Sequence, residues 1–156
     1  HQVESTKAAG ACVDALLGIL SSSRNDPVAV ADLVCIVDRE EIGLSIVQEL
    51  HQKRIGVIHT FGLGDSHRAR NENSRRKKLA FYKGDARVKI TTIQSFKGWE
   101  SRALVVQISD AGNPKELALA YAGITRLKRD DRGCYLTVVC SAPQLLEFGE
   151  TWPQHA

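Results

Sequence analysis

Two short segments contain side chains whose types and spacing suit the recognition of phosphate. In the first, residues 91–100, Lys97 and Gly98 follow a β-branched stretch and Glu100 comes two positions later. A glycine lets the backbone approach a ligand without a Cβ clash, and a carboxylate accepts hydrogen bonds from hydroxyl groups. In the second, Arg126 supplies a planar, permanently charged donor group that suits phosphate oxygens. Both segments could therefore contribute to a site for a phosphate-bearing ligand.

The first segment also carries small polar side chains ahead of its lysine. Thr92, Gln94 and Ser95 precede Lys97, and small hydroxyl and amide groups can bond to phosphate oxygens. Trp99 could stack on a base, an interaction worth about 1–3 kcal/mol. A tryptophan between a loop and a strand more often anchors packing, and we predict that role here.

Positive charge is concentrated in the middle of the chain, in a stretch that offers little to pack. The cations there are Arg68, Arg70, Arg75, Arg76, Lys77 and Lys78. The net charge of the whole chain is only +3, which alone does not indicate nucleic acid. The run could be a solvated loop or helix face, or a patch that follows phosphates. We expect a basic loop over about residues 62–80, whose last four cations contact DNA.

The elements that must position these residues alternate along the chain. Apolar runs of strand length cover residues 33–37, 55–61, 88–93, 103–108 and 135–140. Helical spacing covers residues 6–22, 40–53 and 114–128, and Pro143 begins a short terminal helix. Strands that alternate with helices imply crossover connections and a mostly parallel sheet. We predict a single three-layer α/β domain over residues 1–156, with ligands bound beyond the carboxyl ends of the strands.

Composition sets broad limits on the class of protein. A chain of 156 residues with 43% hydrophobic and 25% charged residues suits one globular domain. No apolar run approaches the roughly 20 residues of a membrane span, and no signal peptide is visible, so we expect the cytosol and no membrane partner. The four cysteines and five histidines lack metal-ligand spacing, so we expect buried free thiols and no metal site. Because the chain starts with His1 and contains no methionine, we interpret it as a piece of a longer polypeptide.

The two segments together resemble motifs V and VI of superfamily 1 DNA helicases of the UvrD/Rep type. The sequence TTIQSFKGWE before the strand at 103–108 is similar to the family pattern T-x-H-x-x-K-G-x-E, and AYAGITRLK is similar to Y-V-A-x-T-R-A-K. Gln94 stands where the family has histidine, which puts any role for an imidazole in doubt. The resemblance covers about residues 32–140. It departs between residues 61 and 88, where larger relatives insert an accessory domain.

This resemblance implies the second, RecA-like motor domain of an ATP-dependent helicase. Arg126 would then be the catalytic arginine finger, a role that typically accelerates phosphoryl transfer about 10³- to 10⁵-fold. The family also implies that Gly98 lies beside the nucleotide and that Glu100 binds its ribose. It further implies that single-stranded DNA is contacted through its phosphates by Thr92, Gln94, Ser95 and Lys97. A further γ-phosphate contact is implied for the end of the first strand, where the register leaves Asp38 and Arg39 as alternatives; we assign it to Arg39.

The chain lacks two parts that ATP hydrolysis requires. It has no G-x-x-x-x-G-K-[ST] loop and no acidic pair on a strand for Mg²⁺. The resemblance places both on an N-terminal motor domain of the same polypeptide. We therefore expect ATP with Mg²⁺ as cofactor, single-stranded DNA or a duplex/single-strand junction as partner, a role in DNA repair in the bacterial cytosol, and no activity of this chain alone.

Other functions also fit the residues. The chain could be a non-enzymatic nucleic-acid-binding module derived from a helicase domain, which the replacement at Gln94 makes conceivable. It could belong to an RNA motor or to a helicase fused to a nuclease, or it could be a small-ligand α/β domain with two chance motif matches. Tyr121 and Ile124 lie three positions apart on a predicted helix, and we predict that both pack in the core and have no ligand role.

Overall fold

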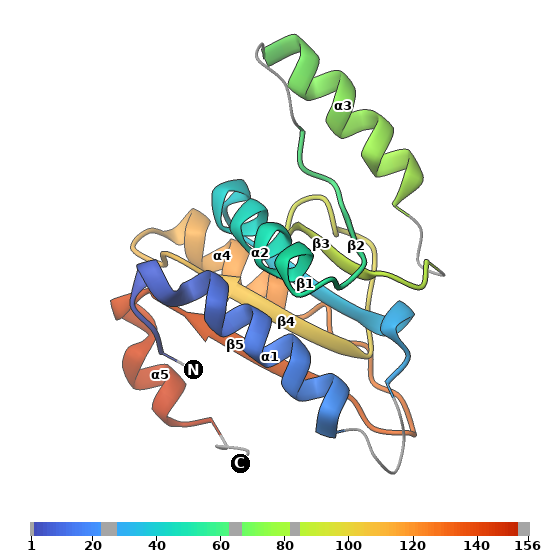
Figure 1. Cartoon of the computed structure of the whole chain (residues 1–156). Coiled ribbons are helices and arrows are strands. Elements are labelled where there is room, and N and C mark those ends of the chain that lie inside the picture. The colour runs from blue at the N-terminus through green and yellow to red at the C-terminus, as the bar shows by residue number, and fades with distance from the viewer. Residues whose placement is uncertain (1, 23–27, 63–66, 82–84, 153–156) are drawn as a thin grey trace.

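A parallel sheet forms the middle layer of the computed structural model, which describes residues 2–22, 28–62, 67–81 and 85–152 (Figure 1). The strands are β1 (Leu33–Val37), β2 (Val57–His59), β3 (Val88–Thr92), β4 (Ala103–Ile108) and β5 (Tyr135–Cys140). They lie in the order β2-β3-β1-β4-β5, and every pairing is parallel. The mostly parallel sheet predicted from the sequence is confirmed.

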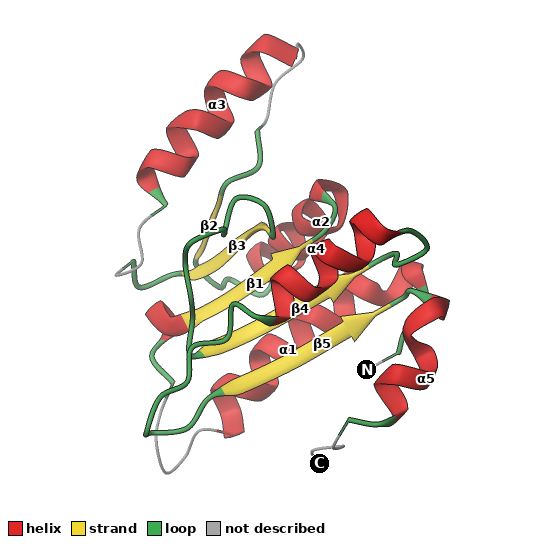
Figure 2. Ribbon diagram, turned by 180° about the vertical axis from the view of Figure 1, so that it is seen from behind, coloured by secondary structure: helices red, strands yellow, loops and turns green. Residues whose placement is uncertain are grey.

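Helices cover both faces of this sheet. The helices of the chain are α1 (Ala8–Ser22), α2 (Glu40–Gln52), α3 (His67–Ala80), α4 (Pro114–Ile124) and α5 (Leu146–Glu150), with short 3₁₀ turns at Ser5–Lys7, Val30–Asp32 and Pro143–Leu145; α3 extends away from the sheet. α1 and α2 lie on one face, and α4 lies on the other together with the connection from β3 to β4 (Figure 2). The three-layer α/β architecture expected from the sequence is therefore present.

β1 lies at the centre of the sheet because both of its faces are apolar. All five of its residues are buried, as are those of β3 and β4 beside it. Val37, the last residue of β1, pairs with Thr92 on one side and with Gln107 on the other. An unbroken apolar run is typical of such a doubly covered strand. The register brings the carboxyl ends of β1, β3 and β4 to the same edge.

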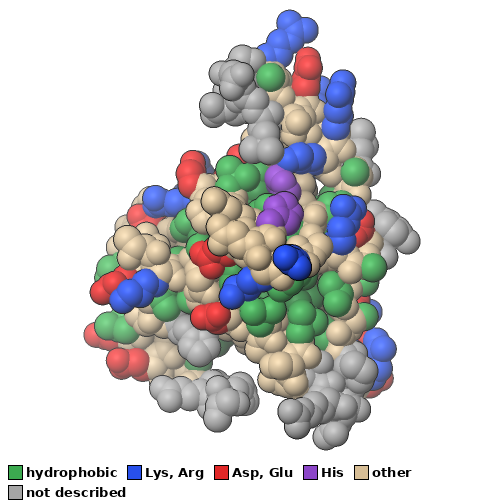
Figure 3. All heavy atoms as spheres, viewed as in Figure 1, with side chains coloured by type: hydrophobic (Ala, Val, Ile, Leu, Met, Phe, Trp, Pro, Cys, Tyr) green, Lys and Arg blue, Asp and Glu red, His purple; other side chains and the backbone are tan. Residues whose placement is uncertain are grey.

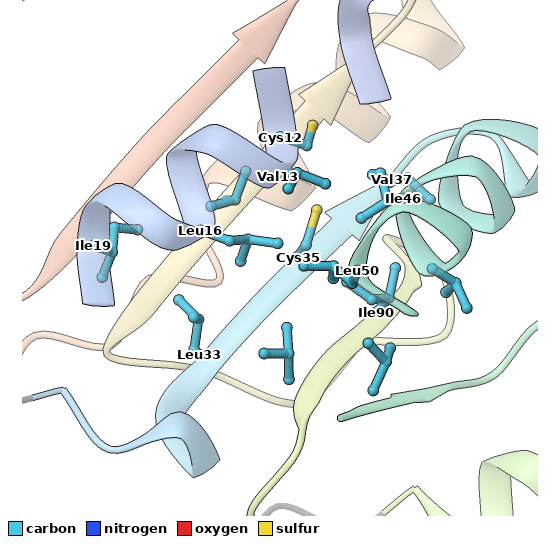
Figure 4. Close-up of a cluster of buried hydrophobic side chains, with 14 of the residues drawn as sticks. Cys12, Val13, Leu16, Ile19, Leu33, Cys35, Val37, Ile46, Leu50 and Ile90 are labelled. Carbon is cyan, nitrogen blue, oxygen red and sulfur yellow. The ribbon is translucent and has the colours of Figure 1, made fainter. Parts of the chain in front are cut away.

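Each face of the sheet has its own apolar core. Under α1 and α2, Leu16, Ile46 and Leu50 are fully buried against β1 and β3 (Figure 4). Under α4, Phe96 and Leu104 belong to a second cluster. These two cores stabilise the layers on both sides of the sheet, since burial of apolar area is the dominant favourable contribution to folding.

Three of the cysteines are buried and one is exposed. Cys12 on α1 and Cys35 on β1 are fully buried in the first core, where both are drawn in Figure 4. The pKa of the Cys35 thiol is raised, mainly by a hydrogen bond with Cys12 and to a smaller extent by burial. Cys140 is also buried, and Cys134 is exposed just before β5. All four are free, but the prediction that all are buried is wrong for Cys134.

A buried lysine lies at the amino ends of the central strands β1 and β3. Lys89 on β3 is 1% exposed, and its Nζ donates to the carbonyl oxygens of Ala31 and Asp85 at 2.8 and 2.7 Å. Burial lowers the pKa of this lysine. Backbone carbonyls from the approach to β1 and from the approach to β3 are thereby joined by one side chain.

The structure departs from the sequence predictions at two helices. The described part of the expected basic loop contains α3, a helix of 14 residues; residues 63–66 lie outside the described residues. The helix predicted to reach residue 128 ends at Ile124, where the amide of Arg126 bonds to the carbonyl of residue 123, three positions back, and the α-helical pattern stops. The placement of Tyr121 in the core is wrong, since its side chain is 71% exposed, whereas Ile124 packs against the second core.

No helix among the described residues is long and apolar enough to cross a membrane.

Two helical glycines should respond oppositely to replacement by alanine. A Cβ on Gly43 would lie 2.1 Å from Cζ of the buried Phe61 ring, whereas a Cβ on Gly18 meets nothing within 4 Å. Gly43→Ala should lower the free energy of unfolding by about 1–3 kcal/mol through overpacking. Gly18→Ala should raise it by roughly 0.5–1 kcal/mol through helix propensity. Urea midpoints at constant m-value measure both changes, and equal midpoints for the two variants would contradict the packing of α2 on Phe61.

Candidate functional site

A groove of about 930 Å³ opens beside α4, where the ends of β1, β3 and β4 meet. Six of the residues singled out from the sequence line it, namely Asp38, Arg39, Gln94, Lys97, Gly98 and Arg126. They come from three segments that lie far apart along the chain. The fold therefore assembles cationic and amide side chains around one hollow, as binding of an anionic ligand requires.

The loop after β3 is shaped by its own hydrogen bonds. Ile93 donates its amide to the carbonyl of Val37 at 2.9 Å, which extends the pairing with β1. The hydroxyl of Thr92 donates to Ser95 Oγ at 2.9 Å and accepts the Ser95 amide at 3.1 Å. Gly98 has a φ of 85°, a conformation that favours glycine although no neighbouring atom would meet a Cβ there.

These contacts divide the predicted DNA-binding residues of the loop into two groups. Thr92 is 8% exposed, and its hydroxyl is engaged with Ser95 inside the turn. Gln94 and Lys97 are exposed and line the groove. The pair of hydroxyl groups thus fixes the loop, and the amide and the ammonium group are presented to a ligand.

Three aromatic rings pack together at the loop that follows β3. The Trp99 ring lies 6.4 Å from the ring of Phe96 and 6.1 Å from that of Phe81, the residue that follows α3. Phe96 and Phe81 are buried, and Trp99 is 38% exposed. The predicted packing role of Trp99 is confirmed, and the cluster joins the loop to the end of α3.

Arg126 follows the end of α4 and is held there by local contacts. Its Nε donates to the carbonyl of Ala122 at 3.1 Å, and one terminal nitrogen donates to Thr125 Oγ1 at 3.3 Å. Its backbone carbonyl accepts the amide of Ser101 at 3.0 Å, and Lys128 donates its amide to the Ser101 carbonyl at 2.8 Å. The guanidinium group is therefore half-buried at the groove wall on a backbone segment that is tied to the β3–β4 connection.

The two candidate residues at the end of β1 have different contacts, although both line the groove. The carboxylate of Asp38 accepts the amide and the hydroxyl of Ser109 at 2.6 and 2.9 Å, which ties β1 to β4. Arg39 is exposed and its terminal nitrogen lies 4.0 Å from Asp110 Oδ2. The carboxylate of Asp38 is thus bonded within the fold, whereas the side chain of Arg39 is exposed.

Glu100 is not brought to the groove. It is exposed beyond Trp99 and is not among the residues that line the hollow. Arg102, two positions later, is 4% exposed and donates to the carbonyls of Arg132 and Gly133 at 2.9 and 2.7 Å. The chain therefore leaves the groove at Gly98 and turns toward the start of β4.

The wall opposite the loop was missed by the sequence analysis. It is formed by Asp110, Asn113, Lys115 and Glu116. Asn113 caps α4, because its Oδ1 accepts the amides of Lys115 and Glu116 at 3.0 and 3.1 Å. An asparagine before a proline is a recognisable helix start. That signal, combined with the rule that ligands bind beyond strand ends, could have indicated this wall.

α3 presents its cations in two different ways. Arg75, Arg76 and Lys78 are exposed, and Lys and Arg side chains gather where Figure 1 shows α3 (Figure 3). Lys77 is partly buried, and its Nζ lies 3.1 Å from His59 Nε2 on β2. Ser74 Oγ donates to the carbonyl of Thr60 at 2.9 Å. Lys77 therefore contributes to the attachment of α3.

Burial controls the charge of the histidine in this attachment. Burial, together with the smaller effects of the Lys77 and His51 charges, lowers the pKa of His59 to about 4. Burial also lowers the pKa of Lys77. The imidazole is thus neutral near pH 7 and can accept a hydrogen bond from the ammonium group.

Among the described residues, no group of three or more His, Cys, Asp or Glu side chains could hold a metal ion. The acidic residues at the groove belong to hydrogen bonds and an ion pair of the fold, as described for Asp38 and Asp110.

Comparison with solved structures shows a shared fold. The chain matches the crystal structure of the C-terminal part of the Fun30 ATPase domain with a TM-score of 0.50 and 10% identity, over 96% of this chain and 46% of that one. It thus spans less than half of the matched chain. A second match is the C-terminal domain of a possible DNA helicase from a Lactobacillus strain, WCFS1, at 15% identity over 94% and 93% of the two chains; its TM-score of 0.31 carries no weight.

Sequence comparison gives no relatives. No protein-family profile matches the chain, and no curated protein matches it in sequence. What the comparisons establish is therefore the architecture: this chain has the three-layer, RecA-like α/β fold.

The neutral His59 should make stability depend on pH. Its pKa is about 4 in the folded chain and 6.5 in the unfolded chain, so the unfolded state binds more protons between these values. The free energy of unfolding should therefore fall as the pH is lowered from 6.5 to 4. His59→Gln should remove this contribution, measured as a flatter dependence of the urea midpoint on pH than in the wild type. Parallel pH profiles of the two proteins would contradict the shifted pKa.

Proposed function

We propose that this chain is the second motor domain of an ATP-dependent DNA helicase of superfamily 1, and that the groove beside α4 closes onto a nucleotide bound to a preceding motor domain. One observation carries the proposal: Arg39, Lys97 and Arg126, from three separate segments, line one groove at the carboxyl ends of parallel strands. Open α/β sheets bind ligands at this edge.

Arg126 is the arginine finger in this proposal. A guanidinium has five N–H donors, so the two contacts that hold it beside α4 leave donors for a phosphate oxygen. Its attachment to Ala122 and Thr125 restricts the side chain before the ligand arrives, which lowers the entropy lost on binding. The finger would neutralise charge that develops on the transferring phosphoryl group.

Arg39 supplies a second cation to the same phosphates. Its contact with Asp110 is long and exposed on both sides, and such a pair contributes about 0–1 kcal/mol. A phosphate can therefore replace the carboxylate at little cost. Gly98 lets the loop backbone approach the nucleotide, and Glu100 reaches the ribose only when the two motor domains approach each other.

The same loop would hold single-stranded DNA. Gln94 and Lys97 are exposed on a turn that Thr92 and Ser95 fix, so they can bond to successive phosphates without reading bases. Because Lys97 and Gly98 line the nucleotide groove as well, closure of the groove would also move this loop. ATP with Mg²⁺ would be the cofactor, with the metal ligands on the preceding domain, and DNA repair in a bacterial cytosol the setting.

The arginine finger is tested in the polypeptide that joins this chain to a phosphate-binding motor domain. Arg126→Ala should lower the rate of hydrolysis stimulated by single-stranded DNA about 10³- to 10⁵-fold, while binding of ATP is largely kept. The matched control is Arg129→Ala, since Arg129 is exposed and does not line the groove. Turnover is measured by phosphate release.

If Arg126→Ala hydrolyses ATP at the wild-type rate, Arg126 is not the arginine finger. Absence of DNA-stimulated hydrolysis in the wild-type polypeptide would instead favour the non-enzymatic nucleic-acid-binding module, which the glutamine at position 94 already makes conceivable.

The chain on its own should bind single-stranded DNA weakly and hydrolyse no ATP, because it lacks a phosphate cradle and an acidic pair for Mg²⁺. Phosphate release is measured with and without a single-stranded oligonucleotide, and anisotropy of the labelled oligonucleotide reports binding. Robust hydrolysis by the isolated chain would show that the assignment to a second motor domain is wrong.

A further inference from the structure

α3 has two faces of different character. Asn73, Ser74 and Lys77 are partly buried against the end of β2, through Ser74 to Thr60 and Lys77 to His59. At 3.6 residues per turn, residues 68 and 75 lie on the opposite side of the helix from these three. Figures 1 and 2 show α3 extending away from the sheet, and residues 68 and 75 are exposed.

The outer face is strongly basic. Arg75, Arg76 and Lys78 are exposed there. Arg68 lies on the same side and forms an exposed ion pair with Glu72 at 3.4 Å. Among the described side chains of α3, Glu72 is the only acidic one, so the charge of this face is positive after that pair is formed. A binding partner with complementary charge would be a polyanion.

The shape of α3 selects between kinds of polyanion. Proteins that hold a single strand combine a basic groove with aromatic side chains on which bases stack. Residues 67–80 contain no Phe, Tyr or Trp, and α3 stands out as a rod without forming a groove. A duplex presents rigid rows of phosphates, about one charge per 1.7 Å of axis. A straight basic helix can meet several of them together without ordering a flexible chain.

The base of α3 is joined to the loop proposed to grip the single strand. Phe81, directly after α3, contacts the Trp99 ring, which in turn contacts Phe96 in the loop that carries Gln94 and Lys97. The helix is also attached at the end of β2, the strand next to β3 from which the loop emerges. One polyanion could therefore run from α3 to the loop.

We propose that the outer face of α3 is a duplex-binding arm, which holds the phosphates of double-stranded DNA ahead of the strand gripped by residues 92–98. The position of the duplex ahead of the strand rests on the proposed function; the binding of a duplex by α3 rests on the charge and shape of the helix. Contact is with the backbone, so affinity is independent of base sequence and falls as salt rises.

The test uses this chain and two labelled probes, a blunt-ended DNA duplex and a single strand of the same length. Arg75→Gln, Arg76→Gln and Lys78→Gln are combined in one variant. A control variant carries the same change of charge at the exposed Lys7, Lys53 and Arg129, which lie outside α3. Fluorescence anisotropy gives the dissociation constant for each probe as salt is varied.

Three phosphate contacts correspond to a slope of about −2.7 in log affinity against log salt, or a loss of roughly fortyfold between about 50 and 200 mM. We expect the α3 variant to lose most of this slope and at least about tenfold in duplex affinity at low salt. Its affinity for the single strand should stay close to that of the wild type. The control variant should retain most of its duplex affinity.

Three results would overturn the proposal: no binding of the duplex by the wild type, equal losses of the α3 variant on both probes, or equal losses of the α3 and control variants. Circular dichroism of each variant excludes unfolding as the cause. Failure here leaves the hydrolysis experiment on Arg126 unaffected. Conversely, if duplex binding depends on α3 but the polypeptide shows no DNA-stimulated hydrolysis, the proposed motor function is wrong and the duplex-binding role of α3 stands.

Discussion

β1 is hydrogen-bonded to β3 on one side and to β4 on the other, and the candidate site depends on this double pairing. Because all three strands run parallel and in register, the chain leaves each of them at the same edge. Arg39 follows β1, the loop with Lys97 follows β3, and the wall with Asp110 follows β4. The bonds from Ser109 to the Asp38 carboxylate fix two of these exits relative to each other. A shift of either pairing by one residue would send the groove residues to different faces.

The strands at residues 33–37, 103–108 and 135–140 were predictable to the residue, because apolar runs bounded by polar residues have few alternatives. α3 was not, because a helix that docks through Ser74 and Lys77 leaves no apolar period in the sequence. Tyr121 shows a different limit, because residues three apart share a helix face only roughly: Ile124 packs on the second core, and Tyr121 lies at the edge of that face, 71% exposed.

The candidate site was predictable in its cations and not in its assembly. Arg39, Lys97 and Arg126 could be chosen by residue type and by resemblance, and the structure brings them to one groove. Whether a polar side chain serves the fold or faces a ligand depends on partners that are distant in sequence, such as Ser109 for Asp38. Glu100 illustrates the same point, since no local pattern indicates that the chain has already left the groove there.

The distribution of thiols has a practical consequence. Cys12, Cys35 and Cys140 are buried, so Cys134 is the one cysteine on the surface. It precedes β5, the strand at the opposite edge of the sheet from β2, to which α3 is attached. Thiol reagents reach buried sulfur slowly and exposed sulfur readily. The native sequence therefore offers one addressable position for a fluorophore, far across the sheet from the basic helix, without any engineered cysteine.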